Sequence, residues 1–205
     1  MMEAVERRSQ AERSTESRKK LIEAAIHLLA TRGYAGTTLA EIGQLAGLSR
    51  GMVTHHFGTK EACVEAVVAA MHTWILETVQ KAIGPRRGLL ALDALVEVYF
   101  TLLRGQSAGA RAMFIVRTEG VATVPRLREL TAENNESLRR VIAERLTEAI
   151  TDGDMDAQVD PDVTSVLVEG VLRGAGAQWL LDPKRVDLDA AGAALKRIFR
   201  ARCRP

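Results

Sequence analysis

One short segment, residues 33 to 61, places several helix-start signals around a tight glycine turn, and this spacing limits the folds open to the chain. Thr38 and Glu41 have the spacing of a capping box, in which the hydroxyl accepts a hydrogen bond from a free amide at the helix start and the carboxylate accepts one from the cap's own amide. Ser49 and Thr59 are strong N-caps for further helices. The segment therefore predicts a helix start directly after each of these caps.

The connection between the first two of these helices is very short. The first helix has apolar residues at positions 39, 42, 45 and 46, which share one face, and Gly47 can adopt the left-handed conformation that ends it. Only Gly47, Leu48 and Ser49 lead to the second helix, which runs to about Phe57. A glycine turn of this length sets two helices at the steep angle of a helix-turn-helix, whose second helix enters the major groove of DNA.

The rest of the chain is predicted to be helical as well. Of its 205 residues 47% are hydrophobic, which is enough to bury a core in one large or two small domains. Only 4% are aromatic, and no run alternates with the period of two that a half-buried strand shows. We expect an all-α protein with further helices over residues 15–32, 60–83, 89–104, 108–119, 125–150, 161–181 and 188–202.

The charge of the chain is nearly balanced. The formal net charge of +2 does not indicate a nucleic-acid partner by itself, but residues 1 to 60 carry nine Lys and Arg against six Asp and Glu. No stretch approaches the ~20 apolar residues of a membrane span, and the charged N-terminus lacks the apolar core of a secretion signal. We therefore expect a soluble, cytoplasmic protein with no membrane partner.

The residue types that bind metals form no recognisable site. Cys63 and Cys203 lie far apart, with no cysteine or histidine at a ligand spacing. Acidic residues alternate between positions 152 and 162 as in a calcium loop, but Ala157 and Val163 stand where that loop needs glycine and glutamate. We expect no metal and no cofactor.

The helix-turn-helix segment resembles the tetracycline-repressor (TetR) family of bacterial transcription regulators. The residues that carry this resemblance are Leu21, Ala24, Ala25, Leu28, Gly33, Tyr34, Thr37, Thr38, Ile42, Ala46, Gly47, Ser49, Gly51, His56, Phe57, Lys60 and Glu61. The resemblance implies a dimer of about nine helices per chain. It implies a DNA-binding domain over residues 15–60 and a ligand-binding and dimerisation domain over 61–205. Residues 1–14 before them are polar and alternate in charge, and we expect a flexible arm there. One departure is Thr54, where the family often has an aromatic residue.

The expected partner of the second helix is a double-stranded DNA operator. Arg50 can pair with the two acceptors of guanine, and Met52 can pack on a thymine methyl group. Affinity would come mainly from contacts with phosphates. The full set of predicted DNA-binding residues is Thr38, Ser49, Arg50, Gly51, Met52, Thr54, His55, His56 and Lys60.

A small-molecule effector would need a cavity in the C-terminal region. Polar groups on inward helix faces are the best indicators of such a cavity, because an unpaired buried amide or charge costs ~1–3 kcal/mol. Asn134 is the first choice, ahead of Arg117 and His72. Aromatic and sulfur-containing side chains would belong either to the core or to the cavity wall. The predicted lining is His72, Trp74, Tyr99, Phe100, Met113, Phe114, Arg117, Asn134 and Trp179.

Small residues on the helix over 161–181 allow another helix to approach closely. They would serve either packing inside the protomer or a two-fold seam made with the final helix, and the resemblance favours the seam. The predicted homodimer interface comprises Gly170, Gly174, Ala177, Leu188, Leu195, Ile198 and Phe199.

The sequence thus predicts a non-enzymatic, homodimeric repressor that a small molecule of unknown identity releases from a palindromic operator. The alternative is a helical enzyme or small-molecule carrier that uses the C-terminal cavity, with the N-terminal helices as scaffold. A nucleoid-type protein that binds DNA without sequence preference is a further alternative, which a specificity ratio would separate.

Overall fold

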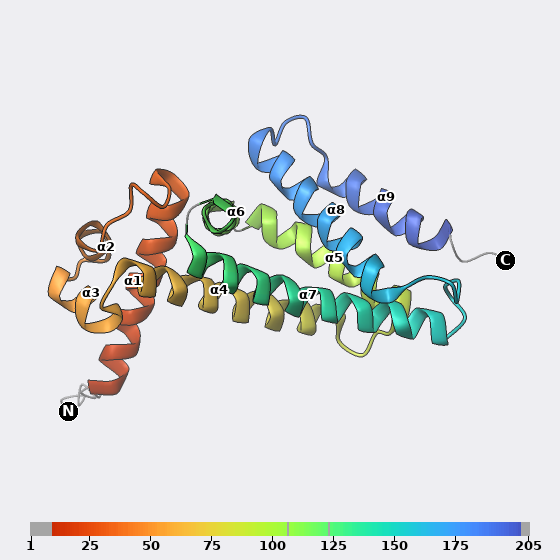
Figure 1. The fold of residues 1–205 in the computed structure, drawn as a ribbon, viewed down its shortest axis with the longest axis horizontal. Helices are drawn as coiled ribbons and strands as arrows, with labels where there is room; N and C mark the ends of the chain where they lie inside the picture. Colours follow the sequence, from red (N-terminus) through yellow and green to blue (C-terminus); the bar gives the residue numbers. More distant parts are fainter. Residues whose placement is uncertain (1–9, 106, 123, 202–205) are drawn as a thin grey trace, which may run out of the picture.

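A computed structural model describes residues 10–105, 107–122 and 124–201, and within these ranges the fold is entirely α-helical (Figure 1). The helices are α1 (Gln10–Arg32), α2 (Leu39–Ala46), α3 (Arg50–Phe57), α4 (Lys60–Ile83), α5 (Gly88–Gly105), α6 (Ser107–Ala122), α7 (Pro125–Thr151), α8 (Pro161–Leu181) and α9 (Leu188–Ala201). The order and type of the elements agree with the sequence prediction.

The helices form a small N-terminal head and a longer body (Figure 1). The core of the head joins residues of α1, α2, α3 and the first half of α4 to part of α6 and the start of α7. The core of the body joins the second half of α4 to α5, α7, α8 and α9. Helix α4 therefore contributes to both cores and links the head to the body.

Helix α6 lies between the head and the body and packs closely against α1 (Figure 1). Ala112 and Val116 on α6 are fully buried in the head core. At the other end of α6, a Cβ atom on Gly120 would come within 2.9 Å of the backbone nitrogen of Arg128 on α7. The helix is thus fixed on one side to α1 and at its end to α7, so a shift of α6 would be transmitted to the head.

Helix α4 is long and apolar enough, by length and composition alone, to cross a membrane. Its apolar side chains have other partners in this fold: Cys63, Val64, Val67 and Val68 are buried in the head core, and Val79 and Ile83 in the body core. The hydropathy of α4 is therefore explained by its two cores.

The first helix begins earlier than its sequence pattern indicates. It starts at Gln10, five residues before the predicted start at 15, so residues 10–14 of the predicted flexible arm are helical. Ala, Glu and Arg in this stretch are good helix formers, and the prediction gave too much weight to their lack of an apolar face. Residues 1–9 of the arm, and Arg202 at the predicted end of the last helix, lie outside the described residues.

Candidate DNA-reading surface and ligand cavity

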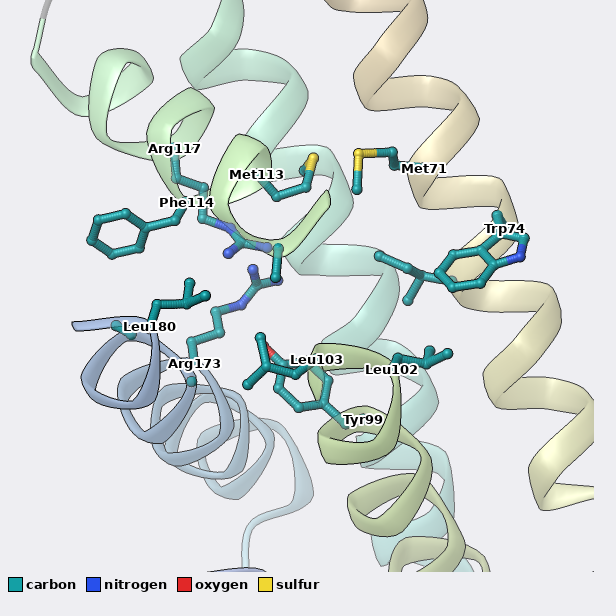
Figure 2. A pocket seen from close by; sticks show the side chains of 14 residues that line it. Met71, Trp74, Tyr99, Leu102, Leu103, Met113, Phe114, Arg117, Arg173 and Leu180 are labelled. Atoms are coloured by element: carbon teal, nitrogen blue, oxygen red, sulfur yellow. The ribbon is translucent and has the colours of Figure 1, made fainter. Parts of the chain in front are cut away.

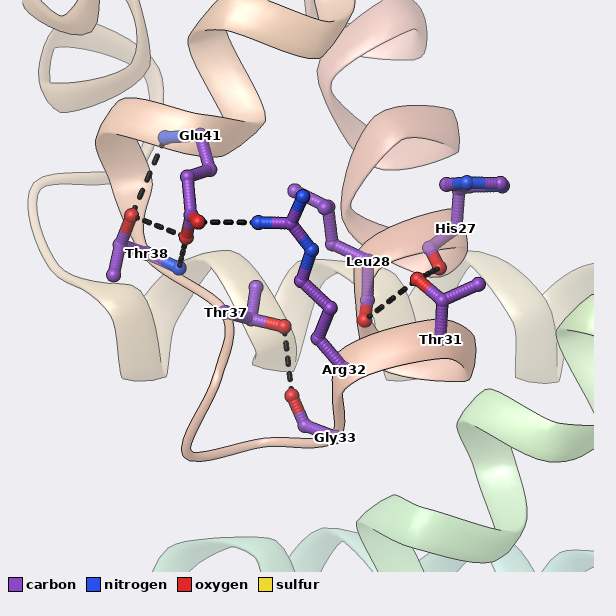
Figure 3. A network of polar contacts seen from close by, with 8 residues as sticks. All are labelled: His27, Leu28, Thr31, Arg32, Gly33, Thr37, Thr38 and Glu41. Atoms are coloured by element: carbon purple, nitrogen blue, oxygen red, sulfur yellow. Dashed lines mark hydrogen bonds and ion pairs between the residues drawn. The ribbon is translucent and has the colours of Figure 1, made fainter.

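The N-terminus of α2 is held by the predicted capping box (Figure 3). The Thr38 hydroxyl accepts from the Glu41 amide at 3.3 Å, and the Glu41 carboxylate accepts from the Thr38 amide at 3.1 Å. Arg32, at the end of α1, forms an ion pair with the same carboxylate. The hydrogen bond from the Thr38 side chain, and then the charge of Arg32, lower the pKa of Glu41. The box thus fixes α2 both to its own cap and to α1.

Two glycines shape the turn between α2 and α3. Gly47 has φ of 68°, the left-handed conformation predicted for the end of α2. Gly43 lies at the point where the two helices meet: a Cβ atom there would come within 2.9 Å of the Leu48 carbonyl oxygen and 3.0 Å of Val53 Cγ2. Gly43 carries no local signal in the sequence, since its closest contacts form only when α2 and α3 are packed together.

Helix α3 presents its outer face to solvent. Ser49 caps it by accepting a hydrogen bond from the Met52 amide at 3.2 Å. Val53 is its buried residue and points into the head core. Exposed residues of α3 are Arg50, Gly51, Met52, Thr54 and His55. The predicted reading residues therefore lie on an accessible surface, where a DNA duplex can approach them.

The start of α4 adds a cationic edge to this surface. Thr59 caps α4 by accepting from the Ala62 amide at 3.1 Å, and the Lys60 ammonium lies 4.2 Å from the centre of the Tyr34 ring. The Tyr34 hydroxyl donates to Glu61 at 3.3 Å. Burial, and then the Glu61 carboxylate, raise the pKa of Tyr34 to about 12. Tyr34 thus holds Lys60 beside the amides at the start of α4, a geometry suited to a phosphate.

Two hydroxyls of the predicted set already have partners within the protein. Thr38 also donates its hydroxyl proton to Glu41 at 2.7 Å, and Thr54 donates to the Arg50 carbonyl oxygen at 3.2 Å. Each can still accept a hydrogen bond, but phosphate oxygens need donors. Thr38 and Thr54 are therefore less suited to phosphate contacts than Lys60 is. His56 is partly buried beside Phe57, and burial lowers its pKa.

The body holds a cavity of about 90 Å³ between α4, α5, α6 and α8 (Figure 2). Most of its wall is apolar. Five of the nine predicted residues line it, namely Trp74, Tyr99, Met113, Phe114 and Arg117, and Ala177 from the predicted dimer set lines it too. The remaining lining residues are Met71, Ile75, Leu102, Leu103, Ala110, Arg173, Gly176 and Leu180.

The other predicted lining residues lie elsewhere. Phe100 is buried in the body core, and Trp179 packs against that core outside the cavity. His72 and Asn134 do not line the cavity either. The prediction for Asn134 rested on an unpaired buried amide, and its Nδ2 atom is indeed buried without a hydrogen-bond partner. The unpaired amide on α7 therefore did not locate the cavity, which α7 does not line.

Two arginines meet in the cavity (Figure 2). The guanidinium groups of Arg117 on α6 and Arg173 on α8 point toward each other, with Tyr99 of α5 close by. Arg173 forms an ion pair with Glu169 through its Nη2 at 2.5 Å, and its Nε donates to the same carboxylate at 2.6 Å. Nε of Arg117 and Nη1 of Arg173 are buried without a hydrogen-bond partner. Arg173 was not among the predicted residues, because its spacing in the sequence does not distinguish it from other arginines.

The outer face of α8 carries apolar side chains that have no cover within the protomer. Val163, Val166, Leu167 and Val171 on α8, and Ile198 on α9, are exposed. A Cβ atom at Gly170 or Gly174 would meet nothing within 4 Å, so these two glycines of the predicted seam do not serve helix packing inside the protomer.

Three residues of the predicted seam belong to the body core instead. Leu188, Leu195 and Phe199 are 2%, 4% and 5% exposed. They lie on the side of α9 that packs against α5 and α8, and the sequence analysis assigned the apolar stripe of α9 to a partner rather than to the protomer. Leu195 and Phe199 also form the floor of an apolar groove whose rim is Leu167, Val171 and Ile198.

Among the described residues, no group of three or more His, Cys, Asp or Glu side chains has the arrangement of a metal site. Cys63 is a buried free cysteine, and burial raises the pKa of its thiol to about 11, which disfavours the reactive thiolate.

Comparisons with known families cover most of the chain. Residues 21–67 match the model of the bacterial regulatory proteins of the tetR family, and residues 90–204 match that of the C-terminal domain of BetI-type transcriptional repressors. The first match contains the capped helices of the head, and the second contains most of the body.

Individual relatives agree with these matches. Over 73 residues, 36% of this chain and 34% of the relative, the sequence is 44% identical to the HTH-type transcriptional regulator CymR of Pseudomonas putida. It is 26% identical over 185 residues, 86% of each chain, to the HTH-type transcriptional regulator TtgR of the same species. A transcriptional regulator from Saccharomonospora viridis in complex with choline has the same fold, with a TM-score of 0.79 at 21% identity over 90% of this chain and 95% of that one.

Proposed function

Because the chain belongs to the TetR family of bacterial regulatory proteins, it is a DNA-binding transcriptional regulator, and we propose that it is a repressor which a small-molecule effector releases from a palindromic operator. The observation that carries this proposal is the exposed outer face of α3. The caps of α2 and α3, and the close contact of the two helices at Gly43, fix the position of α3 relative to α2. The cavity would bind the effector without chemical turnover, since the relatives are transcriptional regulators.

On the operator, base readout is assigned to Arg50 and Met52. Arg50 is exposed at the start of α3, where the first residues of a recognition helix reach base edges. Phosphate contacts are assigned to Lys60 and to the free amides at the starts of α3 and α4, with His55 and His56 beside them. Gly51 has open space around its Cβ position apart from the Ser49 hydroxyl at 3.8 Å, so a DNA backbone can approach it closely.

The dimer would form through the outer face of α8 together with Ile198 of α9. This face joins exposed apolar residues to glycines that leave room for a second helix, as a two-fold seam requires. The apolar groove beside Leu167 offers about 200 Å³ for side chains of the partner. A dimer of this kind would present its two α3 helices to the two half-sites of a palindrome.

The effector signal would pass through α6. Met113, Phe114 and Arg117 on this helix line the cavity, while Ala112 and Val116 on the same helix are buried against α1. A ligand that moves α6 therefore moves the surface on which the head rests. The effect on DNA follows only if the ligand has a higher affinity for the conformation that fits the operator poorly.

The proposed reading role is tested by selecting bound fragments from the host genome and titrating the selected operator with Arg50 and Lys60 variants. We expect Arg50→Ala to lose ~1–3 kcal/mol on the operator and to relax base preference at one position of each half-site. Lys60→Ala should weaken all sequences alike and reduce the salt dependence of binding. Unchanged base preference for Arg50→Ala would remove Arg50 from the reading role.

The proposed dimer is tested by placing a charge on the seam. Leu167 is 64% exposed in the protomer, so Leu167→Glu should leave the protomer folded while making the chain monomeric and abolishing tight operator binding. Leu90 on α5 is 65% exposed and lies away from the seam, so Leu90→Glu is a matched control that should stay dimeric. Analytical ultracentrifugation of both variants measures their oligomeric state. If Leu167→Glu were still dimeric, the proposed interface on α8 would be wrong.

A further inference from the structure

Arg117 is a partly buried cation without an ion-pair partner among the described residues. Its Nε atom is inaccessible and makes no hydrogen bond, and burial lowers the pKa of its guanidinium, although the group stays charged at neutral pH. An uncompensated buried charge is costly to a fold and is normally paired. The position of Arg117 on the cavity wall suggests that its partner comes from outside the protein.

The charged side chains at and beside the cavity carry an excess of positive charge. Arg139 and Arg173 form ion pairs with Glu169, and Arg139 is also paired with Glu136 at 2.8 Å. Arg117 makes no ion pair with Glu169 but lies within range of its charge, and Arg140 lies within range of Glu136. Protonation of Glu169, whose pKa burial raises, would only increase the excess. The cluster therefore favours an anion in the cavity.

We propose that the effector is a small carboxylate with a single negative charge on an apolar body, whose two oxygens bind between Arg117 and Arg173. This inference rests on the proposed function, because it takes the cavity to be the effector site. The two guanidinium groups approach each other from α6 and α8 (Figure 2), and among the described residues the Arg117 guanidinium makes no hydrogen bond and no ion pair that would occupy its terminal nitrogens. A planar carboxylate between two such forks accepts from both.

The remainder of the cavity limits the size and polarity of the ligand. Apart from Tyr99 and the two arginines, the side chains that line it are apolar, including Met71, Trp74 and Ile75 on α4. The cavity volume of about 90 Å³ is smaller than the ~150 Å³ that holds a benzene molecule in an engineered apolar cavity. Trp74 and Phe114 on its wall are each 41% exposed, so the cavity opens to solvent and a single ring can extend past its mouth. The apolar body should therefore be a short branched chain or at most one ring, and a long acyl chain would lie mostly outside.

A cationic ligand does not suit this cavity. The regulator of Saccharomonospora viridis holds choline, but the carboxylate of Glu169 already accepts from Arg173 in this chain. A quaternary ammonium ion would add a further positive charge to a cluster that is already cationic. A dianion would also fit poorly, because its second charge would have to enter the apolar wall or face Glu169.

The proposed carboxylate would act on the helix that touches the head. Arg117 lies one residue after Val116, which is buried against α1 in the head core. An anion that draws Arg117 toward Arg173 pulls α6 toward α8, and α6 is the element packed against both α1 and α7. Arg117 would thus both recognise the carboxylate and transmit its binding to the head through α6.

The inference is tested with the full-length protein free of DNA, by calorimetric titration with a panel of single-ring and short-chain acids. The panel contains benzoate, 4-methylbenzoate, 4-ethylbenzoate and 3-methylbutanoate, each beside its neutral primary amide, together with terephthalate and choline. We expect at least one acid to bind roughly tenfold to a hundredfold more tightly than its own amide, because hydrogen bonds to charged groups are strong. Terephthalate and choline should bind more weakly than that acid.

Substitution of the unpaired arginine gives a second arm. Arg117→Met should abolish the preference for the acid over its amide, while the unfolding temperature of the free protein stays the same or rises, since a buried unpaired charge is removed. Arg117→Gln should give the same loss of preference. Arg111→Met is the matched control, because Arg111 is exposed on the same helix and does not line the cavity.

The outcomes separate this inference from the proposed function. Binding of choline or of the neutral amides in preference to the acids, or no saturable binding of any acid in the panel, overturns the carboxylate proposal. An acid that binds with the expected preference but leaves the selected operator fully occupied upholds the carboxylate site and contradicts its role as effector. Operator selection without ligand tests the DNA-reading role independently of both.

Discussion

The head and the cavity differ in how completely their polar groups are hydrogen-bonded. In the head, the caps of α2, α3 and α4 take their partners from residues three positions further along the chain. In the cavity, Arg117 and Arg173 approach from helices far apart in the sequence and leave donors unpaired. The local hydrogen bonds of the head are complete in the free protein, whereas the cavity leaves donors that a ligand could satisfy, and a ligand can shift the conformation only through such differential contacts.

The glycines of the two regions show the same contrast. Gly43 in the head is pressed against the Leu48 carbonyl oxygen and Val53. Gly170 and Gly174 on α8 face open space in the protomer. The glycine in the head serves packing that is already complete, and those on α8 leave room for contacts that a second chain would make.

The largest expected effect is on stability, when valine replaces the tightly packed Gly43 of the head or the open Gly170 of α8. Gly43→Val should lower the free energy of unfolding by about 3 kcal/mol, because the new side chain would collide with backbone that cannot move freely. Gly170→Val should change it by less than about 0.5 kcal/mol, since valine and glycine differ little in helix propensity. Urea unfolding followed by circular dichroism measures both, on a Leu167→Glu background that isolates the protomer.

Equal losses of stability for the two valine variants would show that α2 and α3 are not in close contact at Gly43. The proposed difference in packing between Gly43 and Gly170 would then be wrong.

A smaller effect should come from removing one cap in each region. Ser49→Ala removes the hydrogen bond to the Met52 amide, and Asp160→Ala removes those to the Asp162 and Val163 amides. Each should cost ~1 kcal/mol of stability. Operator titration should separate them, because the loss at Ser49 also weakens DNA binding while the loss at Asp160 leaves base preference unchanged. A shift in base preference for Asp160→Ala would contradict the division of roles.

The smallest effect should be a dependence of operator binding on pH. Burial, and then the charges of His55 and Arg18, hold the pKa of His56 below its ordinary value of 6.5 in the free protein. A phosphate beside the imidazole would favour the charged form, so binding takes up a proton and affinity rises as the pH falls. We expect a gain of roughly threefold between about pH 7.5 and about pH 5.5, typical of an exposed ion pair.

The control for this dependence is His56→Gln, whose affinity should vary less over the same range. The stability of the free protein should move in the other direction. Because the folded-state pKa of His56 is lowered, the unfolded chain binds more protons below pH 6.5, and the contribution of His56 to stability falls as the pH drops through that value. An identical pH profile for His56→Gln would exclude a phosphate contact at this residue.

The features that the sequence predicted correctly depend on near neighbours in the chain. The capping box of Thr38 and Glu41, the left-handed Gly47 and the cap at Ser49 are all confirmed, because each hydrogen bond or dihedral involves residues within one helical turn. The helices were found for the same reason. Arg173 carried no local signal, although it became visible once α6 and α8 faced each other across the cavity.

The amphipathic patterns also predicted which face of each helix is apolar. They did not predict whether that face packs inside the protomer or against a partner. Leu188, Leu195 and Phe199 form a stripe on α9 that would suit either a partner chain or the protomer, and the packing of α5 and α8 against α9 decides for the protomer. Asn134 was identified as an unpaired buried amide, yet only the arrangement of the helices shows that the cavity lies elsewhere.

By itself, the sequence determined the helices, their caps and the short turn between α2 and α3, since these follow from hydrogen bonds and periodicity within a few residues. The tertiary structure alone decided that Arg117 and Arg173 share a cavity, that α6 joins this cavity to the head, and that the outer face of α8 has no cover in the protomer. Charge balance and burial are sums over residues distant in the chain, and no local pattern records them.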